Sequence, residues 1–226
     1  FTLNDALVKA FNEKNSFWEH GTTRLYKNLQ NDFLYSNINN VVIFAENHDT
    51  NRINDFYPKF KNYKQILSVL MTIRGIPQIY YGSEIGMTGK KQVGDGDIRR
   101  DFPGGWPEDT QNAFSENGRV SKQAKYYDFS KKLIQWRKTN AAIHFGKTLH
   151  YVPRDDVYVY FRYTDDERVM IIVNNNTLDQ KISLNRYSEG IAGRTQAFEI
   201  ISEAAFKLPK VLKIPAETTL IFELSL

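Results

Sequence analysis

The chain has 226 residues, of which 41% are hydrophobic, 25% are charged and none is cysteine. This composition is typical of a globular protein, and it excludes a disordered chain, a disulfide framework and thiolate metal sites. The net charge is only +4, the longest basic runs are pairs, and no apolar run approaches the ~18 residues of a membrane span, so nucleic acid and membranes are not expected partners.

Four helices are expected in the first part of the chain, because apolar side chains recur there at helical spacing. Gly75 and Pro77 supply the signals that end the third helix. Residues 86–118 are rich in Gly, Pro and Asp without a period, and a loop of that length in a compact domain is usually functional or disordered. The expected helices cover residues 2–12, 23–33, 60–74 and 121–138.

Two short strands are expected between these helices. Residues 41–45 form a continuous apolar, β-branched run that is too short for a helix and typical of a strand buried on both faces of a parallel sheet. Residues 78–81 form a second strand, which ends at Gly82. The order strand, helix, strand predicts a right-handed βαβ crossover, so this part of the chain is expected to be α/β.

The pattern changes from Lys147 onward, where short β-rich runs are separated by turn residues. Such a pattern predicts an antiparallel sheet or sandwich. We therefore place a domain boundary near residues 140–147, with an α/β domain at residues 1–146 and an all-β domain at residues 147–226. The expected strands are residues 157–163, 169–173, 181–184 and 218–224.

The densest group of polar residues follows the first strand directly. It consists of Glu46, Asn47, His48 and Asp49. Ligands of parallel α/β proteins bind where strands end at their carboxyl side, so these side chains are candidates for binding or catalysis. A carboxylate beside a histidine can bind sugar hydroxyls, relay a proton or hold a metal. The alternative is an Asx-type turn that starts the next segment.

A second group lies in the long loop, where Asp95, Asp97 and Arg99 alternate with glycine and apolar residues. Alternating carboxylates can bind calcium, but no ligand run here ends in Glu at the twelfth position of an EF-hand. Pairing of arginine with a carboxylate, which fixes a loop or holds polar substrate groups, is an equal alternative. Trp106 and Tyr81 could stack on sugar rings, although buried aromatic residues are the more frequent outcome.

The remaining polar candidates carry less information. His20, His144 and His150 are isolated in the sequence, which favours a structural role for each. Glu84 follows the second strand. It would either face the same cleft as the polar residues after the first strand or cap the following turn. The sequence holds no Gly-rich phosphate loop, nucleophile elbow or zinc-helix motif.

Three segments resemble motifs of the α-amylase family, glycoside hydrolase family 13, and come closest to neopullulanase and cyclomaltodextrinase-type enzymes. They resemble the family's seventh barrel strand ending in Asn-His-Asp, its eighth strand, and the Asp-x-x-x-Arg element after that strand. These segments are residues 44–49, 75–84 and 95–99. The resemblance implies the C-terminal part of a TIM (β/α)8 barrel, with its last two strands and helices, followed by an antiparallel β-sandwich domain.

The resemblance also implies roles for individual residues. Asp49 would be the third carboxylate, which stabilises the oxocarbenium-like transition state. His48 and Asn47 would contact the substrate, and Asp95 and Arg99 would hold the non-reducing side of the sugar in the cleaved subsite. The implied substrate is an α-glucan such as a maltodextrin, a cyclodextrin or starch. No cofactor is required for this chemistry, and structural calcium is allowed but not indicated.

The sequence departs from the family pattern in one large respect. A retaining glycosidase needs a nucleophilic carboxylate and a general acid about 5–5.5 Å apart. The family carries them at the ends of barrel strands four and five, and nothing before Phe44 resembles either strand. The chain is therefore expected to be an inactive C-terminal fragment of a longer glycosidase.

Several alternatives stay open at this point. The longer protein could be a transglycosylase or glucosyltransferase on the same scaffold, or a non-catalytic binding or structural relative, which the intact Asn47-His48-Asp49 triplet argues against. An incomplete barrel would expose its open side, through which the chain could self-associate. The compartment is unknown, and export to the periplasm or medium would follow from the family alone.

Overall fold

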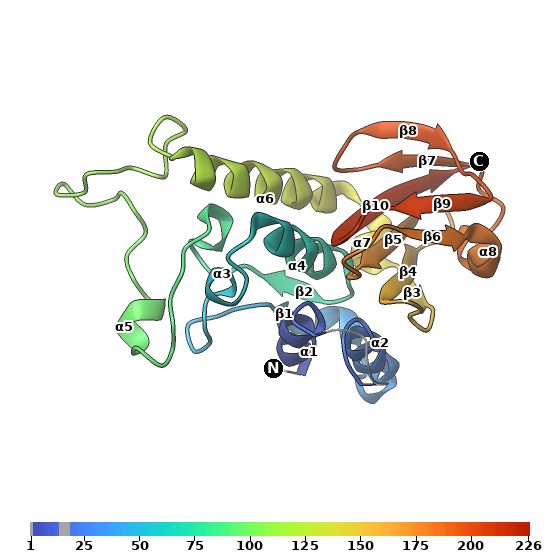
Figure 1. Cartoon of the computed structure of the whole chain (residues 1–226), viewed down its shortest axis with the longest axis horizontal. Helices are drawn as coiled ribbons and strands as arrows, with labels where there is room; N and C mark the ends of the chain where they lie inside the picture. Colours follow the sequence, from blue (N-terminus) through green and yellow to red (C-terminus); the bar gives the residue numbers. More distant parts are fainter. Residues whose placement is uncertain (1, 14–18) are drawn as a thin grey trace.

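The computed structural model describes residues 2–13 and 19–226. Helices and two short strands form one side of the molecule, and a larger antiparallel sheet forms the other (Figure 1). A long loop between the short turn at Ser83–Ile85 and helix α6 (Ser121–Thr139) projects away from both sides and carries the short helix α5 (Asp95–Ile98) (Figure 1). Among the described residues, no helix is both long and apolar enough to cross a membrane.

The four helices expected from apolar spacing are present, with shorter ends in three cases. They are α1 (Thr2–Ala10), α2 (Thr23–Gln30), α4 (Phe60–Thr72) and α6 (Ser121–Thr139). The second helix ends before Phe33, whose side chain is 80% exposed and therefore gains nothing from a longer apolar stripe. Four helices of four or five residues were not expected, because so few residues show no period: α3 (Ile53–Phe56), α5 (Asp95–Ile98), α7 (Ala141–Phe145) and α8 (Ser188–Ile191).

The two short strands pair in parallel, as the βαβ pattern predicts. β1 (Val42–Phe44) lies beside β2 (Ile76–Gln78), with Ile43 opposite Pro77. The second strand thus begins two residues earlier and ends three residues earlier than expected. Pro77 is tolerated because β2 has β1 as its one neighbour in this sheet.

The prediction that the first strand is buried on both faces was wrong. Val42 of β1 and Ile76 of β2 are 54% and 52% exposed, whereas Ile43 is buried. The physical reason is that the sheet has two strands, so one of its faces lacks the cover that a full parallel sheet receives.

The second half of the chain forms a six-stranded antiparallel sheet in the order β3-β4-β5-β10-β7-β8 and a separate two-stranded sheet. The four strands expected from β-rich runs are present, and four further strands of four residues each were missed. The six strands are β3 (Lys147–His150), β4 (Val157–Tyr163), β5 (Arg168–Asn174), β10 (Thr218–Ser225), β7 (Gln196–Glu199) and β8 (Ala204–Lys207), and the two-stranded sheet joins β6 (Gln180–Ser183) to β9 (Val211–Ile214).

The central strands β4 and β5 of the six-stranded sheet are buried on both faces, whereas the edge strand β8 is mostly exposed. Side chains on one face, such as Ile171, join an apolar core with α1, α4 and α6, while those on the other, such as Ile172, pack against β6 and β9. The first core is crossed by a buried hydrogen bond between Thr72 Oγ1 and Tyr160 Oη at 2.6 Å. One core therefore joins both sides of the boundary near residue 146, and the division into two domains stays a prediction.

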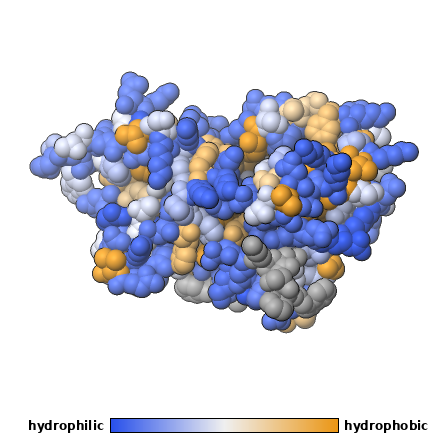
Figure 2. All heavy atoms as spheres, viewed as in Figure 1, coloured by the Kyte–Doolittle hydropathy of each residue, from blue (hydrophilic) through white to orange (hydrophobic). Residues whose placement is uncertain are grey.

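The surface over these cores is mostly hydrophilic in the view of Figure 2, with apolar side chains in small separate groups. The loop that carries α5 is also largely hydrophilic there. Scattered apolar residues of this kind are normal on a protein surface.

Candidate active site

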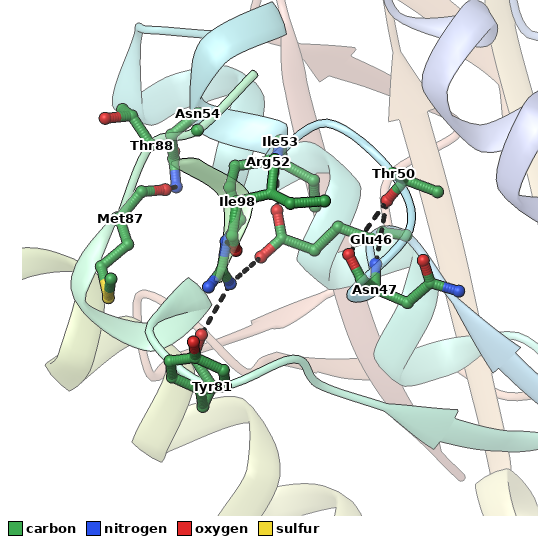
Figure 3. A network of polar contacts seen from close by, with 12 residues as sticks. Glu46, Asn47, Thr50, Arg52, Ile53, Asn54, Tyr81, Met87, Thr88 and Ile98 are labelled. Atoms are coloured by element: carbon green, nitrogen blue, oxygen red, sulfur yellow. Dashed lines mark hydrogen bonds and ion pairs between the residues drawn. The ribbon is translucent and has the colours of Figure 1, made fainter. Parts of the chain in front are cut away.

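The residues that follow β1 form a tight turn. The N–H of Asn47 donates to Thr50 Oγ1 at 2.9 Å (Figure 3). The N–H of Asp49 donates to Asn47 Oδ1 at 2.9 Å. The Asx-type turn expected as an alternative to a functional site is therefore present. It does not exclude function, because it buries Asn47 and leaves the side chains of His48 and Asp49 59% and 50% exposed.

Four residues singled out in the sequence meet beside this turn, and we call them the Asp49 cluster: His48, Asp49, Asp95 and Arg99. Asp49 Oδ2 lies 3.2 Å from His48 Nε2, and its Oδ1 accepts a hydrogen bond from Arg99 Nη2 at 3.1 Å. Arg99 also pairs with Asp95 at 2.9 Å and donates from Nε to the His48 carbonyl at 3.0 Å. The cluster thus joins the end of β1 to helix α5, about fifty residues later.

Sequence reasoning missed Lys91, which contacts the same carboxylates. Its Nζ forms an ion pair with Asp95 and lies 3.9 Å from Asp49 Oδ1. The hydrogen bond from Lys91, with the charges of Arg99 and Lys91, holds the pKa of Asp95 below its usual range. The one available signal was the position of Lys91 four residues before Asp95, which is the spacing of an ion pair on one helix face.

The cluster presents charged and hydrogen-bonding groups without a metal centre among the described residues. No group of three or more His, Asp or Glu side chains is placed there to hold a metal ion. The cluster's two carboxylates, its histidine and its arginine, with the neighbouring Lys91, are all partly exposed and can instead donate to and accept from the hydroxyl groups of a polar ligand. Of the alternatives for the loop, pairing of arginine with carboxylate is the arrangement that the structure contains.

Glu46 does not belong to the exposed group. Its side chain is 2% exposed and turns inward to Arg52, with Nη1 of the arginine 3.3 Å from Oε1 (Figure 3). The backbone N–H of Ile53 donates to its other oxygen. Burial raises the pKa of the Glu46 carboxyl, against the opposing pull of the Ile53 N–H and the Arg52 charge.

The remaining candidates have mixed positions. Trp106 is 63% exposed, and Tyr81 is exposed with its hydroxyl bonded to the Arg100 carbonyl, so neither ring is buried. Glu84 lies in a short 3-10 turn, where burial raises the pKa of its carboxyl. His144 and His150 both hydrogen-bond inside the molecule.

Comparisons with known proteins agree on one family. Residues 148–223 match the family model of the cyclo-malto-dextrinase C-terminal domain. The chain is 32% identical over 142 residues to a cyclomaltodextrin glucanotransferase of Niallia circulans and 35% identical over 143 residues to that of Paenibacillus macerans, in each case over 63% of this chain. An α-amylase of Niallia circulans is 30% identical over 142 residues. The chain belongs to the α-amylase family, glycoside hydrolase family 13.

Solved structures show the same fold over almost the entire length of this family member. The α-amylase from Geobacillus thermoleovorans, complexed with acarbose, covers 99% of the chain with a TM-score of 0.78 and 21% identity. The α-amylase from H. orenii covers 100% with a TM-score of 0.72 and 23% identity. The chain spans only 47% and 48% of these two proteins, and 17% and 18% of the two glucanotransferases. Together with the sequence relatives, these structures confirm the expected family.

Proposed function

We propose that this chain is the C-terminal part of an α-amylase-type enzyme that acts on α-glucosidic bonds of maltodextrins, cyclodextrins or starch with retention of configuration. The Asp49 cluster is the observation that carries the proposal. It lies at the carboxyl end of a parallel strand, where barrel enzymes hold their active sites. Family members complexed with acarbose, maltose and maltotriose support an oligosaccharide as the ligand.

Each residue of the cluster has a role in this proposal. Asp49 stabilises the positive charge that develops on the sugar ring in the transition state. His48 contacts hydroxyl groups of the same ring, and Asp95 with Arg99 holds the non-reducing side. Asn47 contributes as a substrate-binding residue through its amide nitrogen, because its Oδ1 is already bonded to the Asp49 N–H.

The proposal assigns β1 and β2 to the last two strands of a (β/α)8 barrel. In the whole enzyme, the exposed side chains of Val42 and Ile76 would then be covered by other parts of the barrel. The nucleophile and general acid lie on earlier strands of the whole enzyme, and the chain alone is inactive.

Transglycosylation is the second candidate for the whole enzyme. It is favoured by the names of the curated relatives, several of which are cyclomaltodextrin glucanotransferases. Hydrolysis and transfer share the glycosyl-enzyme intermediate and differ in the acceptor that attacks it.

The proposed function is tested on the whole enzyme, expressed with the sequence that precedes Phe1. With maltoheptaose as substrate, we expect products released in the α-anomeric form, measured by proton NMR during the first minutes. A β-anomeric product, or no reaction with maltoheptaose, α-cyclodextrin and soluble starch, would contradict the proposal. New products longer than maltoheptaose would select transfer over hydrolysis.

The exposed strands lead to a prediction for the isolated chain. Unpaired edges and apolar faces of β1 and β2 invite pairing with another copy. We expect either self-association on sizing chromatography or fast hydrogen exchange at residues 42–44. A monomer in which these amides exchange as slowly as those of residues 169–173, in the centre of the six-stranded sheet, would contradict it.

A further inference from the structure

Arg52 lies at the centre of a buried network behind the Asp49 cluster. Its side chain is 0% exposed and spans three segments of the chain (Figure 3). Besides Glu46, the guanidinium donates to the carbonyl of Ile98 at 3.0 Å and to that of Tyr81 at 2.6 Å. Its backbone N–H donates to the Gly89 carbonyl at 2.9 Å.

The energetics of this arrangement favour one fixed geometry. A buried charge is costly unless it is paired and hydrogen-bonded, and Glu46 supplies the opposite charge. The guanidinium carbon also lies 3.9 Å from the centre of the Tyr80 ring, in a cation–π contact. A planar guanidinium can reach the carboxylate, the two carbonyls and the ring together in only one orientation. A lysine ammonium cannot make this set of contacts.

The partners of Arg52 are the backbone neighbours of the Asp49 cluster. Ile98, whose carbonyl it holds, directly precedes Arg99, which binds Asp49 and the His48 carbonyl. Glu46 directly precedes the turn that carries His48 and Asp49, and its carboxylate also holds the Ile53 N–H beyond that turn. Arg52 therefore fixes both backbones from which the cluster is built.

We infer that Arg52, with Glu46, is a positioning residue that sets the distance between Asp49 and Arg99 without touching the substrate. The inference rests on the proposed function for its catalytic consequence, but the loop geometry it describes can be measured without activity. The variant Arg52→Lys keeps the charge and removes the planar fork. Arg162→Lys is a matched control, since Arg162 is also buried and hydrogen-bonded but lies in β4, bonded to Thr148 and the Ile143 carbonyl.

The first test is hydrogen exchange of the 226-residue chain, followed by mass spectrometry of peptides that cover residues 88–102. We expect at least tenfold faster exchange there in Arg52→Lys and no change in Arg162→Lys. Equal exchange in both variants would overturn the inference. If Arg52→Lys does not fold, Glu46→Gln serves instead, because its amide oxygen still accepts from the Ile53 N–H but no longer pairs with a charge; unchanged exchange in this variant would equally overturn the inference.

The second test uses the whole enzyme. A displacement of about 1 Å at reacting groups can cost 10²-fold, so we expect kcat to fall about 10–100-fold in Arg52→Lys. We expect Arg162→Lys to have the same melting temperature as Arg52→Lys but an unchanged kcat. Full activity of Arg52→Lys would overturn the inference. If the whole enzyme has no glycosidase activity while the loop still loosens in Arg52→Lys, the proposed function fails and the positioning role stands.

Discussion

Replacing Asp49 by asparagine in the whole enzyme is expected to lower kcat by about 10²–10³-fold, the loss seen when one preorganised electrostatic group is removed from an active site. Asparagine keeps the shape of the side chain and can still hydrogen-bond to sugar hydroxyls, but it lacks the negative charge. Because that charge matters most in the transition state, kcat and kcat/KM should fall together while KM changes little. Steady-state kinetics with maltoheptaose measure both constants.

Asp97→Asn is the matched control for this experiment. Asp97 lies in the same short helix as Asp95, but its carboxylate accepts from the Lys90 N–H and pairs with Arg100 outside the Asp49 cluster. We expect less than a threefold change in kcat for this variant. A raised KM with unchanged kcat in Asp49→Asn would mean that Asp49 only holds the ground state, contrary to the role proposed here.

The isolated 226-residue chain is expected to release no glucose or shorter oligosaccharides from maltoheptaose. Covalent catalysis divides one difficult step into two easier ones, and it requires a nucleophile opposite a general acid. The proposal assigns this pair to earlier strands of the whole enzyme, so the isolated chain lacks both groups. Product release is measured by chromatography over hours at high protein concentration.

The control for this second experiment is the same chain carrying Asp49→Asn. Activity that persists unchanged in this variant comes from a contaminating amylase of the expression host. Activity above the buffer level that disappears in the variant would show that the chain carries a complete active site, and the proposed division of catalytic groups would be wrong.

The sequence was sufficient for the parts of the fold that have a clear period. Helix α4 has thirteen residues and β4 has seven, and each shows its pattern several times. Strands of four residues show it only once or twice, and β7 and β8 were missed although β6, of the same length, was predicted. The exposure of Val42 could not be predicted either, because it depends on how many strands lie beside β1, which local sequence does not contain.

The residues of the Asp49 cluster could be predicted from the sequence, but the residue that positions them could not. His48 and Asp49 attract notice because polar residues directly follow an apolar strand, and Asp95 and Arg99 because charges alternate in a Gly-rich loop. Nothing in the sequence distinguishes Arg52 from other arginines. Its role arises from contacts with Ile98 and Tyr81, two residues that are remote from Arg52 in sequence. Both contacts are made to backbone carbonyls, which any residue would supply.

The burial of the central strands β4 and β5 on both faces limits how this β-region could be exchanged among relatives by recombination. A transplanted region would have to match the helices through specific polar pairs as well as apolar shape. Tyr160 must meet Thr72, the Asn174 carbonyl must meet Gln65 Nε2, and Glu223 must accept from Trp136 Nε1. Each unmatched pair would leave a polar group without its partner, at a cost of about 1–3 kcal/mol. The β-region and the helices beneath it are therefore expected to be inherited together.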